Sequence, residues 1–109
     1  MDYTPFFLSE YGDTYSICLN CDGEYRTEFF DEFEDKGFCG GNGSDFEAVA
    51  IVFVEEQMPD LEIDYDSEAG MFCAMFGSKE DAEKFAVAYK AAIENDDVFR
   101  ALLKKAEVY

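Results

Sequence analysis

With 109 residues, 49% of them apolar and 17% aromatic, the chain is long enough for one ordinary core and too apolar to be disordered. Its 26 acidic and eight basic residues give a net charge of −18, which repels nucleic acid and anionic membranes and favours a basic protein partner. No run of eighteen apolar residues and no basic leader are present, so we expect a single cytoplasmic domain over residues 1–109, with no membrane contact.

The first part of the chain has the pattern of a hairpin followed by a helical segment. Residues 6–11 predict a strand, residues 12–13 a turn, and residues 14–20, which alternate apolar and polar side chains, a second strand. Residues 24–36 fit two patterns. Their aromatic spacing favours a helix in the second half that ends at Gly37, and their first half also fits a third strand.

Residues 37–47 contain four of the eight glycines and predict a tight loop. Ser44 or Asp45 would cap the helix that follows, up to residue 58, with Asp45 and Glu47 in its first turn, where the helix dipole favours negative charge. A phosphate-binding loop is excluded, because these carboxylates would repel a phosphate and the lysine of such a loop is absent.

The second part of the chain repeats the hairpin-then-helices layout. Residues 61–65 alternate as a half-buried strand, residues 71–76 are apolar as in an inner strand covered on both faces, and helices follow from the caps Ser78 and Asn95. The predicted order is therefore ββααββαα. This order indicates an α+β fold, an antiparallel sheet built from two hairpins with helices packed on one side.

Catalytic and metal chemistry have little support in the sequence. No histidine is present, which removes the usual general base and the commonest metal ligand, so we expect no catalytic residues, no bound metal and no cofactor. Cys18 and Cys21 form one Cys-x-x-Cys, but a zinc site needs a second pair, and a redox pair would open a helix. We interpret the four cysteines as reduced, small apolar residues in or near the core.

Four carboxylates alternate along one short segment: Glu62, Asp64, Asp66 and Glu68. The spacing is similar to that of a calcium loop, but the central glycine is absent, so we interpret them as the solvent face of a strand and keep a divalent-ion site as the weaker alternative. Like charges side by side cost stability. A partner that supplies Arg or Lys is therefore expected.

Five segments together resemble the immunity protein 51 family over essentially the whole chain. They read FFLSEY at residues 6–11, GFCGGNGSDFEA at 37–48, EEQMP at 55–59, DYDSEAGMFCA at 64–74 and KFA at 84–86. The motif positions are Gly40, Gly41, Asn42, Gly43, Phe46, Gly70, Met71 and Phe72. The family usually has Tyr and Trp where this chain has Ser44 and Phe46, so an aromatic ring at 46 is either a core anchor or a partner contact.

The resemblance implies a small α+β immunity protein of a bacterial polymorphic toxin system, which binds the toxin encoded beside it. The charge adds that the toxin is basic, such as a nuclease, and that the chain does not contact nucleic acid directly. The expected toxin contacts are Asp45, Glu47, Glu62, Asp64, Asp66 and Glu68. The alternative is a generic acidic interaction module or nucleic-acid mimic. The sequence determines neither the toxin nor the oligomeric state.

Overall fold

The sheet and its helices follow the predicted order. The structure, a computed structural model, describes residues 3–21 and 25–107. Strands β1 (Phe7–Tyr11), β2 (Thr14–Asn20), β3 (Asp64–Tyr65) and β4 (Met71–Phe76) form one antiparallel sheet in the order β1-β2-β4-β3. The helices in these ranges are α1 (Thr27–Glu32), the 3₁₀ helix η1 (Glu34–Lys36), α2 (Gly43–Gln57), α3 (Lys79–Ile93) and α4 (Asp96–Lys105). None of them is long and apolar enough to cross a membrane.

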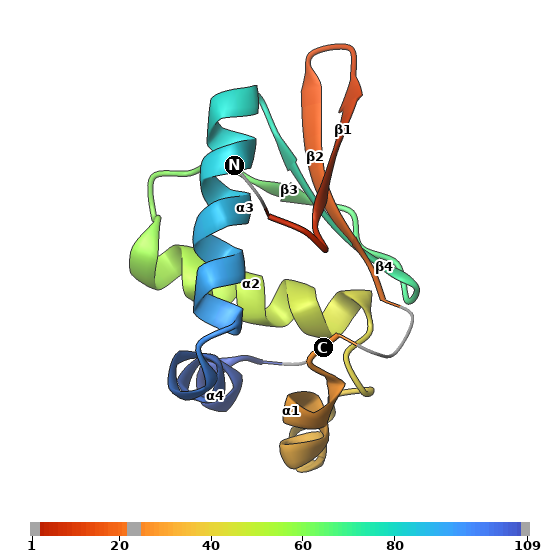
Figure 1. The fold of residues 1–109 in the computed structure, drawn as a ribbon, viewed down its shortest axis with the longest axis vertical. Helices are drawn as coiled ribbons and strands as arrows, with labels where there is room; N and C mark the ends of the chain where they lie inside the picture. The colour runs from red at the N-terminus through yellow and green to blue at the C-terminus, as the bar shows by residue number, and fades with distance from the viewer. Residues whose placement is uncertain (1–2, 22–24, 108–109) are drawn as a thin grey trace.

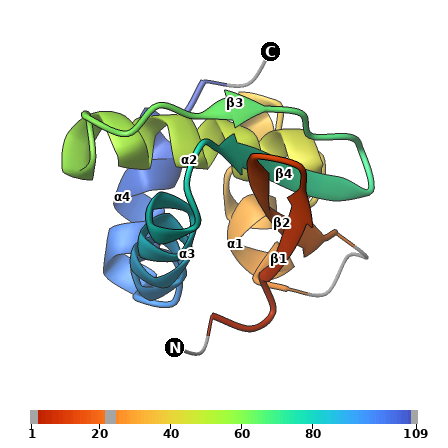
Figure 2. The ribbon, with the colours of Figure 1, turned by 90° about the horizontal axis from the view of Figure 1, so that it is seen from above.

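The helices cover one face of the sheet. Helices α2 and α3 pack against β2 and β4, and no helix of the described residues lies on the other face (Figures 1 and 2). Ile17, Phe72 and Ala74 point toward the helices and are fully buried. The expectation that β4 is covered on both faces is wrong, because Met71 and Met75 point the other way and are only half-buried. Strand β4 has a neighbouring strand on each side, β2 and β3, but the helices of the described residues cover only one of its faces.

Helix α2 begins earlier than predicted. Its N-cap is Asn42 rather than Ser44 or Asp45, so that Gly43 is the first helical residue. The Asn42 side chain accepts a hydrogen bond from the Asp45 N–H at 2.8 Å, and the Asp45 carboxylate accepts one from the Asn42 N–H at 3.2 Å. This reciprocal capping box satisfies two donors that the helix itself leaves unpaired.

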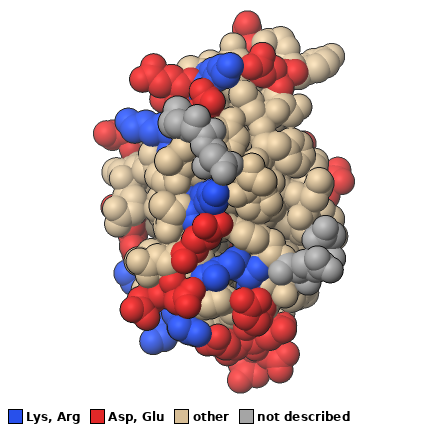
Figure 3. Space-filling model, in the orientation of Figure 1, with Lys and Arg blue, Asp and Glu red and all other residues tan. Residues whose placement is uncertain are grey.

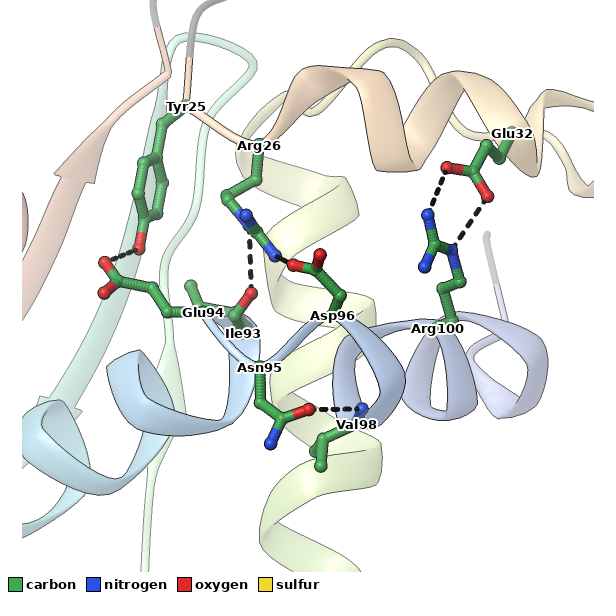
Figure 4. A network of polar contacts seen from close by, with 9 residues as sticks. All are labelled: Tyr25, Arg26, Glu32, Ile93, Glu94, Asn95, Asp96, Val98 and Arg100. Carbon is green, nitrogen blue, oxygen red and sulfur yellow. Dashed lines mark hydrogen bonds and ion pairs between the residues drawn. The ribbon is translucent and has the colours of Figure 1, made fainter.

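The ambiguous segment 24–36 forms a short helix and no strand within the described residues; its first residue, Glu24, lies outside them. Helix α1 has six residues, too few to be stable alone. Figure 4 shows what holds its start to the junction of α3 and α4: the Tyr25 hydroxyl donates to Glu94 at 2.8 Å, and the Arg26 guanidinium pairs with Asp96 at 2.6 Å. Contacts between distant segments therefore decide the structure here.

Aromatic rings fill the core, and one of them carries a buried hydroxyl. Tyr89 is fully buried and packs against Phe53, Phe72 and Phe85, while its hydroxyl donates to the Phe46 carbonyl oxygen at 2.7 Å. Burial, and then the neighbouring tyrosines, raises the pKa of Tyr89 well above its ordinary value of 10.0. Burial also raises the pKa of Tyr25, and its hydrogen bond to Glu94 adds to the shift.

These shifts predict alkaline sensitivity. A tyrosine in the unfolded chain loses its proton near pH 10, whereas Tyr89 in the folded protein keeps its proton to higher pH. The contribution of protonated Tyr89 to the stability of the fold is therefore complete below about pH 9 and is lost as the pH rises further. We expect the free energy of unfolding, measured with urea, to be constant between about pH 7 and 8.5 and to fall above that. The free energy of unfolding should fall less steeply with pH in Tyr89→Phe than in the wild type. An equal slope for both proteins would show that ionisation of Tyr89 is not the cause.

Candidate functional site

The four alternating carboxylates form a continuous exposed line, which we call the acidic row: Glu62, Asp64, Asp66 and Glu68. The alternating apolar residues Leu61, Ile63 and Tyr65 are half-buried against the core. The predicted solvent face of this segment is therefore confirmed. Only Asp64–Tyr65 is assigned as strand, so the paired part is shorter than the alternation predicted.

The register places the acidic row on the face of the sheet that the helices leave uncovered. Asp64 lies opposite Met75, and Glu68 lies opposite Met71. Both methionines point away from α2 and α3, as do the other members of this face. We call it the open sheet face, and it comprises Phe7, Ser9, Tyr11, Thr14, Ser16, Cys18, Asn20, Met71, Cys73 and Met75 together with the acidic row.

Asp45 lies elsewhere, and its predicted role as a contact is corrected. Its side chain is only 1% exposed. One carboxylate oxygen accepts hydrogen bonds from the N–H groups of Cys39 at 2.8 Å, Gly41 at 2.9 Å and Asn42 at 3.2 Å. Gly41 has a φ of 90°, which lets the backbone curl around this oxygen. The N–H groups of the glycine loop thus form an anion-binding site, and the carboxylate of Asp45, from the first turn of α2, occupies it.

The glycine loop also packs directly on the turn between β3 and β4. The Gly43 N–H donates to the Ala69 carbonyl oxygen at 3.1 Å. A Cβ atom at Gly43 would overlap the carbonyl oxygen of Glu68 and lie 2.5 Å from that of Met71. The same turn is held from the other side, where the Cys21 N–H donates to the Gly70 carbonyl oxygen at 2.9 Å. The glycine loop and the turn between β3 and β4, about 25 residues apart in the sequence, are therefore in direct contact.

Glu47 belongs to α2 and not to the open sheet face. It is half-buried on α2, near Tyr65 on the helical side of β3. Burial, and then the charges of Glu47 and Glu55, raises the pKa of Tyr65. Four of the six predicted contacts thus share the open sheet face, Glu47 lies on α2 on the covered side of the sheet, and Asp45 is buried.

All eight basic residues lie on or beside helices. Arg26 caps α1, Lys36 lies in η1, and the other six belong to α3 and α4. The four ion pairs within the described residues join Arg26 to Asp96, Lys79 to Glu10, Arg100 to Glu32 and Lys105 to Glu56. Figure 3 shows basic and acidic side chains interspersed over the helical side. No ion pair in the described ranges reaches the acidic row.

The residue-by-residue prediction missed a second acidic group and a hollow. Four exposed carboxylates of α1 and η1 lie close in sequence: Glu28, Asp31, Glu34 and Asp35. Their density was visible in the sequence, but the mixed strand and helix pattern hid which way they point. Asp13, from the β1–β2 turn, joins Glu62 and Asp64 around a hollow of about 590 Å³. Only the sheet order brings this turn beside β3.

Pairing of β2 with β4 brings Cys18 next to Cys73, not next to Cys21, its partner in the Cys-x-x-Cys motif. Cys18 lies opposite Cys73 across β2 and β4, with the two Sγ atoms 3.8 Å apart and both side chains buried. Burial, and then Cys73, raises the pKa of Cys18 from 9.0 to about 12, so its thiol is neutral. Cys21 is half-buried, and Cys39 is exposed. Among the described residues, no three potential ligands gather to hold a metal ion.

Comparison with known families decides the assignment. A sequence model described as Immunity protein 51 matches residues 6–108. The chain belongs to this family. No curated protein and no solved structure matches it.

The structure also resolves the role of the immunity protein 51 motif positions that the sequence left open. Phe46 is 1% exposed, stacks with Tyr25 and meets Phe30 edge-on, so an aromatic ring here is a core anchor rather than a partner contact. Phe72 is fully buried, whereas Met71 is half-buried on the open sheet face. The glycines and Asn42 shape the anion-binding site and the turn contact. The motif is therefore mainly a folding motif.

Proposed function

We propose that the chain protects its cell by binding a cognate toxin with a basic surface and covering the surface that the toxin needs. The observation that supports this most directly is the acidic row, an exposed line of carboxylates that no ion pair of the described residues reaches. Residues 37–78 contain nine acidic residues and no Lys or Arg. A binding protein needs no catalytic residues, which agrees with a chain that has no histidine.

Electrostatics gives the acidic row two effects. An uncompensated negative surface attracts a positively charged partner over distance and raises the association rate, mostly at low ionic strength. Aligned carboxylates also repel one another in the free protein. Lys or Arg side chains of the toxin would relieve that repulsion, so the bound protein gains stability by mass action. A nuclease toxin fits because its substrate groove is positively charged.

The proposed setting is the cytoplasm of the cell that makes the toxin. Cys18, Cys39 and Cys73 are free thiols, although Cys18 and Cys73 lie side by side. A reducing compartment maintains such thiols.

A charge-matched pair of variants tests the proposal against the toxin domain encoded by the adjacent gene. The first variant removes the four charges of the acidic row with Glu62→Gln, Asp64→Asn, Asp66→Asn and Glu68→Gln. The second removes four charges from α1 and η1 with Glu28→Gln, Asp31→Asn, Glu34→Gln and Asp35→Asn. At low ionic strength we expect the first to slow association about tenfold, with dissociation within about threefold, and the second to have little effect.

The same pair separates local complementarity from total charge. If both variants slow association equally, net charge alone steers the partner and the acidic row is not the contact. If neither variant changes the rate, the electrostatic part of the proposal is wrong. The free acidic-row variant should also melt slightly higher than the wild type, because removing the row's charges relieves its internal repulsion.

A further inference from the structure

The open sheet face exposes apolar side chains as well as carboxylates. Three large apolar side chains are exposed in the described residues: Phe7 at 39%, Tyr11 at 89% and Val98 at 41%. Phe7 and Tyr11 both belong to β1 and point to the open sheet face. Tyr is, with Trp and Arg, one of the residue types enriched among the few residues that carry most of the binding energy at interfaces.

The middle of this face is neutral. Cys18 and Cys73 lie side by side at its centre, 4% and 8% exposed, with half-buried Met71 and Met75 beside them on β4. None of the eight basic residues lies on a strand. The face therefore has a neutral, largely apolar centre, an aromatic border on β1 and an acidic border along β3, the pattern of an apolar interface core with a polar rim.

The acidic border contains a concave feature. The hollow of about 590 Å³ opens between the β1–β2 turn and β3, and Thr14, Asp64 and Met75 of the open sheet face help to line it. Asp13 and Glu62 add two more carboxylates. A long cationic side chain could place its methylene groups against Met75 and its charge among the carboxylates.

We propose that the toxin docks on the open sheet face, with Phe7 and Tyr11 as apolar anchors and a Lys or Arg side chain of the toxin in the hollow. This inference rests on the proposed function. It specifies the partner surface as an apolar patch bordered by basic residues. A tight inhibitor interface buries about 800 Å² on each partner, which is about one eighth of the 6078 Å² exposed by this chain.

The rival surface is the groove between α2, α3 and α4, a hollow of about 640 Å³ that includes Val98, Ala88 and Leu102. Its charges are mixed: Lys84 lines it, and Glu56 at its edge is already paired with Lys105. The groove therefore offers a basic partner no net attraction. It supplies the matched control.

The experiment measures association and dissociation rates with the purified, catalytically inactivated toxin domain of the adjacent gene. Tyr11→Ala and Phe7→Ala are compared with Val98→Ala, after thermal melts confirm that each variant is folded. We expect Tyr11→Ala to raise the dissociation rate about 30-fold, with the association rate within about twofold. Phe7→Ala should raise dissociation by a smaller factor, and Val98→Ala should bind like the wild type.

The outcomes separate the two proposals. If the wild type forms no complex at low ionic strength, the proposed function itself fails. If the wild type binds but neither β1 variant changes dissociation by more than about threefold, the toxin docks elsewhere and this inference is overturned. Faster dissociation of Val98→Ala alone would assign the interface to the groove between the helices.

Discussion

Gly43→Ala should lower the free energy of unfolding by about 4 kcal/mol or more. The added Cβ would overlap the Glu68 carbonyl oxygen and crowd that of Met71, and both obstacles are backbone atoms that cannot rotate away. Moving the turn would break the hydrogen bond from Gly43 to Ala69 and disturb the close pairing of Glu68 with Met71. A loss of this size is a large part of the roughly 5–15 kcal/mol that stabilises a domain. Urea unfolding measures it.

Gly70→Ala is the matched control, because it makes the same change within the turn that Gly43 contacts. A Cβ there meets no atom within 4 Å, and Gly70 is not among the glycines with positive φ. We expect its free energy of unfolding to stay within about 0.5 kcal/mol of the wild type. Equal losses for both variants would show that the close approach at Gly43 is not what requires glycine.

Asp45→Ala should cost about 3 kcal/mol of unfolding free energy. The change removes the acceptor of three backbone N–H groups, and the Gly41 N–H is buried away from water. Each buried donor left without a partner costs about 1–3 kcal/mol, and the capping box is lost as well. Thermal or urea unfolding gives the value. Asp45→Asn keeps one oxygen acceptor and should lose about half as much.

Glu47→Ala provides the control for Asp45, since both lie in the first turns of α2 but Glu47 is only half-buried. We expect it to change stability by no more than about 0.5 kcal/mol. Below its melting temperature, folded Asp45→Ala should associate with the toxin domain at the wild-type rate. A slower rate at full folding would restore Asp45 to the contact surface.

Local patterns predicted the sheet strands well where one face is buried. Thr14–Asn20 and Met71–Phe76 have the predicted bounds, because each alternates or fills positions that the core must bury. The caps Ser78 and Asn95 were also correct, since a cap acts within three residues of itself. The predicted N-cap of α2 was wrong, because Asn42 and Asp45 are both capping residue types and each caps the other's N–H in the structure.

Part of the candidate site was also predicted from local alternation of apolar and polar residues. Alternation alone showed that Glu62, Asp64, Asp66 and Glu68 point away from the core, and the structure places them so. Proximity to a helix start could not show whether Asp45 faces water or the preceding loop. The positive φ of Gly41 turns that loop back over the carboxylate and buries it.

The sequence by itself determined the order of elements, the acidic character of one strand edge and the family, because these depend on residue type and short-range spacing. The tertiary structure alone decided which carboxylates share a surface, why Gly43 cannot carry a side chain, and that Phe7 and Tyr11 border the acidic row's face. The shared surface depends on the strand order β1-β2-β4-β3, which brings together residues more than 50 positions apart. The restriction at Gly43 depends on the packing of the start of α2 against the β3–β4 turn. Pairing between distant strands follows from the packing of the whole core, which no local pattern encodes.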